Sequence, residues 1–231
     1  MTEGSSAAQG AALARLGAYA AGLVPEGGRV GLGSGRAATA FLEALAARVR
    51  EGLTVTGVST SVATAAAARR LGIPLAELTA MPLDLTVDGA DEVDPALNLI
   101  KGFGGALVRE RIVAAASPRQ VILVTPDKLV PRLGTRGRLP VEIVPFARPL
   151  CEQRLAALGC TPRLRTSNGA PFLTDNANVI LDCAIGPLDD PARLEADITA
   201  IPGVIDTGLF LGTATMVVVA EADGVRTLQR S

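Results

Sequence analysis

The 231-residue chain contains no histidine and no tryptophan, and only 3% of its residues are aromatic. Without histidine, a zinc site would need cysteine ligands, but Cys151, Cys160 and Cys183 show no C-x-x-C spacing. We therefore expect no metal site, and we interpret the cysteines as buried free thiols. The few aromatic side chains and the net charge of −1 also argue against a nucleic-acid partner.

Long apolar runs are missing too. The longest are short or are Ala-rich segments broken by arginine, which predicts no membrane span and no membrane partner. The N-terminal segment "MTEGSSAAQG" lacks the basic region and apolar stretch of a signal peptide, so we expect a cytoplasmic protein. With 48% hydrophobic and 19% charged residues, the chain can build the core of one large domain, or of a main domain with a smaller partner.

Lysine is the scarcest charged residue. Of the 22 basic residues only Lys101 and Lys128 are lysine, and the remaining 20 are arginine. Lysine is a compact charge whose pKa shifts easily, whereas arginine does not lose its proton near neutrality. Lys101 directly precedes the glycine-rich run "GFGG", so its position is of interest even though two residues are a small sample.

The first half of the sequence alternates between strand and helix. Helical patterns cover 6–22, 37–50, 62–71 and 105–116, and strand patterns cover 29–33, 54–59, 83–87 and 120–125. This alternation predicts an α/β fold: a Rossmann-like, mainly parallel sheet with helices on both faces. In such sheets ligands bind beyond the carboxyl ends of the strands, where "GSGR", "STS", "DGAD" and "TPDK" are expected to lie.

The second half has a different order. We expect a strand at 141–146, a helix at 147–159, paired strands in "PRLRT" and "NVILDC", a helix near 191–200 and a strand in "GVIDTGLF". This β-α-β-β-α-β order predicts a smaller ferredoxin-like α+β domain over residues 137–212. Residues 1–136 and 213–231 are assigned to the catalytic α/β domain, with "TATMVVVAE" as one more strand of its sheet. Asp175 and Asp182 are expected to be turn and surface acids.

The segment "DGADEVDPALNLIKGFGGALVRERI", residues 88–112, combines acids, a lysine and glycines. Asp88 and Asp91 flank a Gly-Ala pair, Lys101 precedes the glycines, and Glu110 falls on the helix that follows. These groups suit proton transfer beside a carbonyl, because a carboxylate can remove the proton while an ammonium and backbone amides hold the enediolate oxygen. Alternatively, the aspartates cap a turn and Glu110 is a solvated surface acid.

The segment "GLGSGR", residues 31–36, follows a strand and precedes a helix, so its amides could bind a phosphate. Arg36 stands where a dinucleotide-binding motif has its third glycine, and no acid closes the next strand. A phosphate site is favoured over NAD binding, with a purely structural turn as the other alternative. "STS", residues 59–61, could serve only to cap the next helix.

The whole chain resembles type A ribose-5-phosphate isomerase. The matching segments are "VGLGSG", "GVSTS", "VDGADEVDP", "LIKGFGGALVRERIVA", "LPVEIVPFA", "TDNANVILDC" and "IPGVIDTGLF". The resemblance implies interconversion of D-ribose 5-phosphate and D-ribulose 5-phosphate through an enediolate, in the non-oxidative branch of the pentose phosphate pathway. It also implies that no metal or organic cofactor is used and that the protein is a homodimer or a dimer of dimers.

The resemblance also implies roles for individual residues. Glu110 takes the place of the general base, Lys101 steadies the enediolate, and Asp88 and Asp91 contact sugar hydroxyls and assist ring opening. The implied substrate-binding set is Ser34, Gly35, Arg36, Ala37, Asp88, Gly89, Ala90, Asp91, Lys101, Gly102, Phe103, Gly104 and Lys128.

The chain departs from the family pattern in one loop. Arg36 and Ala37 replace two hydroxyl residues of the usual T-G-S-T, so the loop loses side-chain donors and gains a guanidinium. Two other functions remain as alternatives: a non-catalytic sugar-phosphate sensor, and acyl transfer with Glu110 as nucleophile. The first lacks a segment for a DNA-binding helix-turn-helix, and the second has no use for Lys101 and the paired aspartates.

Overall fold

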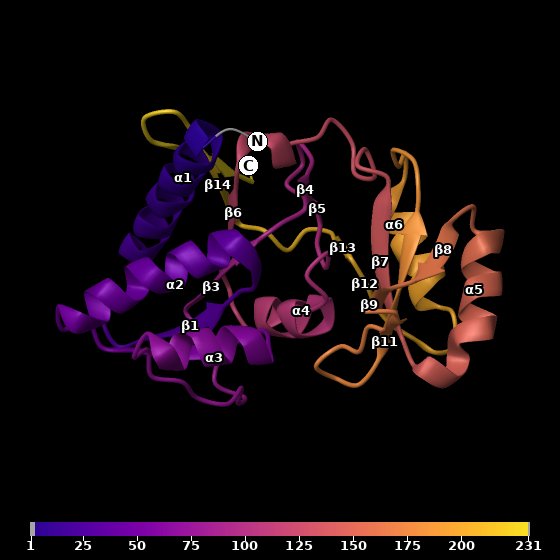
Figure 1. Ribbon diagram of the computed structural model, residues 1–231, viewed down its shortest axis with the longest axis horizontal. Coiled ribbons are helices and arrows are strands. Elements are labelled where there is room, and N and C mark those ends of the chain that lie inside the picture. Colours follow the sequence, from indigo (N-terminus) through magenta and orange to yellow (C-terminus); the bar gives the residue numbers. More distant parts are fainter. Residues whose placement is uncertain (1–2, 231) are drawn as a thin grey trace. The chain divides into compact units, whose positions relative to one another are not determined.

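The computed structural model describes residues 3–230, with side chains described from residue 8 onward. The chain divides into two compact units, which are described separately. Unit 1 comprises the described parts of 1–90, 109–129 and 213–231, and unit 2 comprises 91–108 and 130–212. Figure 1 shows both units with their helices and strands labelled.

Unit 1 is built on a six-stranded sheet with the order β15-β14-β6-β3-β1-β2. Its strands are β1 (Gly28–Leu32), β2 (Val55–Ser59), β3 (Leu85–Gly89), β6 (Gln120–Val124), β14 (Met216–Ala220) and β15 (Val225–Gln229). All neighbours pair in parallel except β14 and β15. The predicted Rossmann-like sheet is thus confirmed, including the return of the chain to it through β14. The antiparallel edge strand β15 was not predicted.

One helix of unit 1 precedes its first strand, and the others connect its parallel strands. They are α1 (Glu3–Gly22), α2 (Gly35–Arg50), α3 (Val62–Arg70) and α4 (Leu107–Ala115), of which the first two residues of α4 are assigned to unit 2. Apolar residues of α1 and α2, such as Leu16 and Phe41, share a buried cluster with Val30 and Val87 of the sheet. Figure 1 shows α1 lying beside α2. On the other side of β1, a Cβ added at Gly31 would meet Val113 of α4, so helices cover both faces.

The strand order reverses direction beside β1. From β1 the chain moves outward to β2, then returns to place β3 on the opposite side of β1. The connections after β1 and β3 therefore lead away in opposite directions, and in sheets of this kind the ligand crevice is expected at the carboxyl ends of these two strands. The structure places the "GSGR" and "DGAD" loops at this point.

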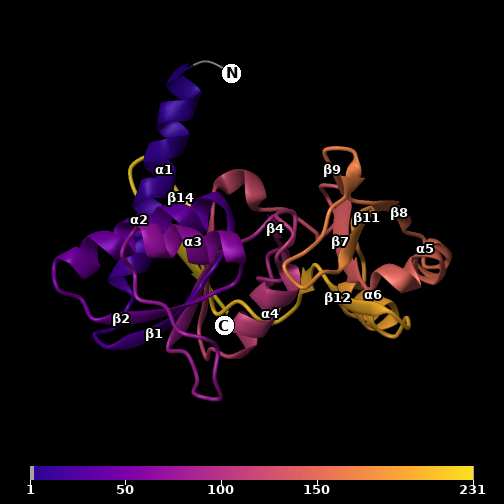
Figure 2. The same ribbon diagram turned by 60° about the horizontal axis from the view of Figure 1, so that its bottom comes forward.

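Unit 2 contains the expected ferredoxin-like arrangement. Its elements are β7 (Arg138–Ile143), α5 (Arg148–Ala157), β8 (Thr161–Leu164), β11 (Val179–Ala184), α6 (Pro191–Thr199) and β12 (Val204–Thr207). The strands form an antiparallel sheet with the order β12-β7-β11-β8. Residues of α5 and α6, including Leu155 and Ile198, join Val141 and Leu181 in one buried cluster, so both helices cover the same face of this sheet. Figure 2 shows the same elements from a second direction.

A second small sheet in unit 2 changes the domain boundaries. It joins β4 (Glu92–Val93) and β5 (Leu99–Ile100) to β13 (Leu209–Phe210), with β5 and β13 antiparallel. Because of these pairings, residues 91–108 belong to unit 2. The other segment of unit 2 begins at Val130, whose backbone N–H donates a hydrogen bond to Val93 O. The division therefore differs from the predicted one, which assigned 1–136 to the catalytic domain. The predicted single strand "GVIDTGLF" is divided between β12 and β13. A short antiparallel hairpin of β9 (Thr166–Ser167) and β10 (Ala170–Pro171) completes unit 2.

The three cysteines are buried free thiols, as expected. The Cys183 thiol is fully buried, and its hydrogen bond with Cys160 and this burial both raise its pKa. Among the described residues, no helix combines the length and apolar character needed to span a membrane.

Candidate active site

The loop after β1 is tied to the end of β3 by Asp88. Its Oδ1 accepts hydrogen bonds from the backbone N–H of Ser34 (3.0 Å) and of Gly89 (2.8 Å). Gly33 allows this contact, because a Cβ there would lie 2.5 Å from the Asp88 Cα. Asp88 is fully buried. The carboxylate therefore fixes the two crevice loops against each other, a structural role that the turn-capping alternative anticipated only in part.

The N-terminus of α2 opens at the same crevice. Ser34 is its N-cap residue but makes no side-chain cap bond. Instead, its hydroxyl lies 2.8–3.2 Å from those of Thr60, Ser61 and Thr64. The first amides of the helix, from Gly35 to Ala37, are therefore not capped by Ser34, and uncapped amides at a helix N-terminus suit a phosphate.

The hydroxyl cluster includes residues of "STS". Ser61 accepts a hydrogen bond from Thr64 N–H and is the N-cap of α3, as the capping interpretation predicted. Arg36, expected to contact phosphate, is exposed, and its Nη1 donates to Gln9 Oε1 of α1 at 3.3 Å.

Two more predicted residues belong to unit 1. Glu110 lies in the first turn of α4 and is only 5% exposed, which is unusual for a glutamate and contradicts the interpretation as a solvated surface acid. Lys128 ends the short helix η1 (Pro126–Lys128) just beyond the carboxyl end of β6, the strand next to β3, and is half-buried. Gly89 approaches the α2 N-terminus, since a Cβ there would lie 3.9 Å from the Ala37 Cβ.

The remaining predicted residues belong to unit 2, where Asp91 holds the glycine-rich loop. Its Oδ2 accepts from Phe103 N–H at 3.0 Å, and its own N–H donates to Ile100 O at 2.8 Å. Lys101 is 2% exposed, its N–H donates to Gly208 O, and its Nζ lies 5.6 Å from the centre of the Phe210 ring. Asp91 and the loop from Lys101 are therefore adjacent in space.

The glycine-rich loop is a tight turn. Gly102 has φ +100° and Gly105 has φ +89°, values that favour glycine, and Gly105 N–H donates to Gly102 O at 3.0 Å. Gly104 is exposed, and a Cβ added to it would meet no atom within 4 Å. The turn presents backbone rather than side chains on its open side.

Asp182 was wrongly expected to be a surface acid. It lies in the central strand β11, where its side chain is 19% exposed, between Arg138 on one neighbouring strand and Arg165 directly after the other. Arg165 donates through Nε to Oδ2 (2.9 Å) and through Nη2 to Oδ1 (2.5 Å), and Arg138 forms a second two-bond pair at 2.9 and 2.8 Å.

The pKa of Asp182 follows from this pairing. Burial is the largest single influence and raises the pKa, but the hydrogen bonds and charges of Arg165 and Arg138 together outweigh it, so the pKa is lowered. No pattern in the sequence identified this network, because its members are separated by 17 and 44 residues.

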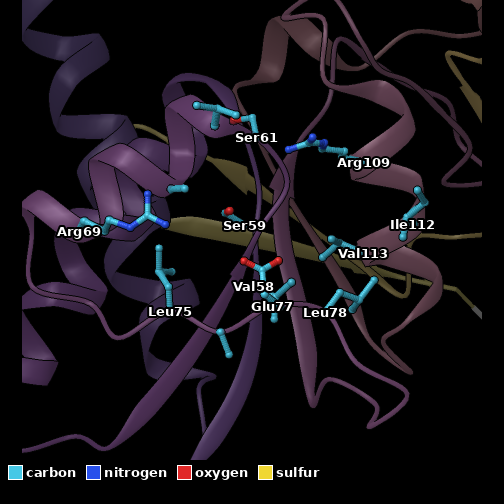
Figure 3. A pocket seen from close by; sticks show the side chains of 13 residues that line it. Val58, Ser59, Ser61, Arg69, Leu75, Glu77, Leu78, Arg109, Ile112 and Val113 are labelled. Carbon is cyan, nitrogen blue, oxygen red and sulfur yellow. The ribbon is translucent and has the colours of Figure 1, made fainter. Parts of the chain in front are cut away.

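Unit 1 contains a cavity of about 520 Å³. Figure 3 shows Arg69 and Arg109 directed into it from opposite walls, with the Glu77 carboxylate between them. Arg109, Ile112 and Val113 line it from α4, but Glu110 does not. None of the predicted catalytic residues lines this cavity.

Comparison with known proteins decides the family. Residues 56–224 match the family model of ribose 5-phosphate isomerase A (phosphoriboisomerase A). The chain belongs to the ribose 5-phosphate isomerase A family. The matched segment covers Asp88, Asp91, Lys101, Glu110 and Lys128.

Individual members of the family are similar over most of their length. Ribose-5-phosphate isomerase A of Roseiflexus sp. (strain RS-1) is 55% identical over 206 residues, which are 87% of this chain and 88% of that protein. The structure of the enzyme from Methanocaldococcus jannaschii is 37% identical with a TM-score of 0.91, covering 94% of this chain and 98% of that one. A D-ribose-5-phosphate isomerase solved in complex with phospho-erythronic acid is 34% identical with a TM-score of 0.90, covering 94% and 98%.

Proposed function

We propose that the chain interconverts D-ribose 5-phosphate and D-ribulose 5-phosphate, with Glu110 moving the proton between C2 and C1 of the open-chain sugar. The overall reaction, an aldose–ketose isomerisation, follows from membership of the ribose 5-phosphate isomerase A family. The observation that carries the residue assignment is the burial of Glu110 and Lys101, two charged groups in the segment covered by the family match. Family membership also decides against acyl transfer by Glu110.

Glu110 suits a base that both removes and returns a proton. Removing the C2 proton leaves an enediolate, and returning the proton at C1 produces the ketose, so one carboxylate above the intermediate can perform both steps. Its burial limits exchange of the carried proton with water. Asp88 is less suited to this role, because its Oδ1 already accepts two backbone hydrogen bonds.

Lys101 and the glycine-rich loop are proposed to stabilise the negative charge of the enediolate. The charge develops only as the proton leaves, so donors aimed at that oxygen lower the barrier more than they strengthen substrate binding. Asp91 supports this role by holding Phe103 N–H. Asp88 and Asp91 remain the proposed contacts for sugar hydroxyls and ring opening.

The phosphate is proposed to bind at the N-terminus of α2, with Lys128 as a further cation. The amides from Gly35 to Ala37 offer donors in place of the hydroxyl side chains that this loop lacks. Phosphate binding would draw Arg36 away from Gln9, its partner in the structure. The Ser34 N–H is bonded to Asp88, so Ser34 would contribute through its hydroxyl, which would have to leave its partners Thr60, Ser61 and Thr64.

The test is turnover of ribose 5-phosphate by chelator-treated protein, measured as ketopentose phosphate formed. Glu110→Gln keeps the shape of the side chain and removes its basicity, so substrate should still bind while kcat falls at least about 100-fold. Glu43→Gln, the same change at an exposed site on α2, is the control and should leave kcat unchanged. A Glu110→Gln variant that retains more than about a tenth of the wild-type kcat would move the base to another residue.

Three further expectations complete the proposal: a homodimer and the absence of a cofactor, which the family resemblance implies, and a cytoplasmic location, which the N-terminal segment suggests. Light scattering on the purified protein tests the first, and fractionation of the producing cell tests the location. If EDTA abolished turnover and one divalent ion restored it, the mechanism without cofactor would be wrong.

A further inference from the structure

We propose that Arg165 is a positioning residue of this reaction: it orients the peptide groups of the Gly102–Gly104 turn so that the Gly104 N–H serves as a fixed donor to the reacting oxygen. This inference rests on the proposed function, and deepens it by naming a residue outside the segment 88–112 that predicts the chemistry. All the groups involved lie in unit 2.

Arg165 holds the turn through two carbonyl groups. Its Nη1 donates to Gly102 O at 3.1 Å and to Phe103 O at 3.2 Å. In a trans peptide group the C=O and N–H point in opposite directions, and none of the peptide bonds that the structure describes is cis. The N–H groups of Phe103 and Gly104 therefore point away from Arg165.

The first of these N–H groups confirms the geometry, since Phe103 N–H donates to Asp91 Oδ2 at 3.0 Å. Asp91 and Arg165 thus bind the two ends of the peptide group between Gly102 and Phe103. The next peptide group is held by Arg165 at its carbonyl end, and its N–H belongs to Gly104, the exposed residue at which an added Cβ would touch nothing within 4 Å. This N–H is directed toward the open side of the turn, where a substrate oxygen can accept from it.

Arg165 can act as a rigid support because it is itself immobilised. Its side chain is 9% exposed, Asp182 binds it through two hydrogen bonds, and Arg138 grips the same carboxylate from the other neighbouring strand. The Phe172 ring lies 5.7 Å from its guanidinium carbon, and the Arg138 guanidinium lies 4.6 Å from the Phe103 ring. A guanidinium bridges carboxylate and carbonyls at once through its fixed fork, whereas the single ammonium of a lysine cannot match that geometry.

The decisive variant is Arg165→Lys, which keeps a positive charge beside Asp182 and removes the planar fork. We expect kcat to fall about 10- to 100-fold, within the cost of displacing a catalytic group by about 1 Å, with KM for ribose 5-phosphate within a factor of about three. The control is Arg163→Lys, the same change at an exposed residue that faces Asp182 across β8 and β11, and it should match the wild type.

A second readout separates positioning from a merely structural role. Phospho-erythronic acid, used as a probe, carries a carboxylate whose two oxygens resemble those of the enediolate. We expect Arg165→Lys to raise the inhibition constant of phospho-erythronic acid by about the factor by which kcat/KM falls, while KM stays nearly constant. This is the behaviour of an interaction made in the transition state. Equal losses in KM and in the inhibition constant, or wild-type kcat, would overturn the proposal.

Amide hydrogen exchange provides a readout that does not depend on turnover. The amides of residues 103–105 should exchange about 10-fold faster in Arg165→Lys than in the wild type or in Arg163→Lys, because two carbonyl anchors are lost.

If the wild type fails to isomerise ribose 5-phosphate, the proposed function is wrong and the catalytic role of Arg165 falls with it, whatever the exchange rates. If the wild type is active and exchange is unchanged, only the inference about Arg165 is wrong. Should Arg165→Lys not fold, Asp182→Asn loosens the same guanidinium, and wild-type kcat and exchange in that variant would overturn the proposal.

Discussion

Gly33→Ala tests whether close approach of β1 and β3 creates the phosphate site. The new Cβ would lie 2.5 Å from the Asp88 Cα, a backbone atom that no rotation of a side chain can remove. Real Cβ atoms stay beyond 3.0 Å, so the loop after β1 must move by at least half an ångström. That movement lengthens the hydrogen bond from Ser34 N–H to Asp88 Oδ1, which is already 3.0 Å long.

The expected cost has two parts. Forcing a methyl group into a packed position costs about 1–3 kcal/mol, and weakening a hydrogen bond to a buried carboxylate costs about 1.5–3 kcal/mol. One movement of the loop can relieve both effects, so we expect the free energy of unfolding to fall by about 2–4 kcal/mol rather than by the sum of the two costs. For a chain of this length that corresponds to a Tm lowered by about 4–16 °C. The α2 N-terminus moves with the loop, so KM for ribose 5-phosphate should rise about 10-fold or more, a loss of about 1.4 kcal/mol in binding.

Gly22→Ala is the matched control, since a Cβ at Gly22 meets nothing within 4 Å and the residue ends α1. Alanine is a better helix former than glycine, so this variant should melt at or above the wild-type Tm with unchanged KM. The test is to measure Tm by thermal unfolding and KM by initial-rate kinetics for the wild type, Gly33→Ala and Gly22→Ala. A Gly33→Ala protein with Tm within about 2 °C of the wild type and an unchanged KM would refute the argument that this contact builds the site.

Three other outcomes are expected. Lys101→Ala should lower kcat about 100- to 1000-fold, as loss of an oxyanion donor does, and Lys101→Arg should not restore it; near-wild-type rates in the arginine variant would reduce Lys101 to a general electrostatic attraction. Arg36→Ala should raise KM more than it lowers kcat if the guanidinium leaves Gln9 for the phosphate, and an unchanged KM would show that amides and Lys128 suffice. The pKa of Asp182 is lowered in the folded state from its usual value of 3.8, so its contribution to stability is complete above about pH 4 and is lost as the pH falls through the folded pKa. Asp182→Asn should therefore lose less unfolding free energy than the wild type between pH 7 and pH 3 in denaturant titrations, and equal losses would contradict the assignment.

Local patterns predicted the elements of the main sheet well. Periodic apolar residues in 37–50 and β-branched residues in 54–59 predicted α2 and β2 within two residues of their ends, because burial of one face enforces the same period in sequence and in structure. Parallel strands and short loops then confine "GSGR" and "DGAD" to one edge of the sheet. Their meeting through Asp88 and Ser34 needed the strand order, which places β3 beside β1.

Glu110 shows the limit of local patterns. Its place on this helix was predicted, but its burial in the first turn of α4 was not, since the flanking arginines, Arg109 and Arg111, made a solvated face the ordinary expectation. The resemblance to a family, rather than periodicity, distinguished Glu110 from a surface acid. The departure at Arg36 was likewise visible in the sequence, whereas its hydrogen bond to Gln9 was not.

The sequence by itself determined the alternation of helices and strands, the glycine positions that permit tight turns, and the acids and lysine that carry the chemistry. Tertiary structure alone decided the unit boundaries and the support behind the turn. Pairing of Leu209 with Ile100 joins residues 109 positions apart, and Asp182 meets Arg138 and Arg165 only because antiparallel register sets them diagonally across three strands. Register depends on how whole sheets bury their faces, a condition that no short stretch of sequence contains.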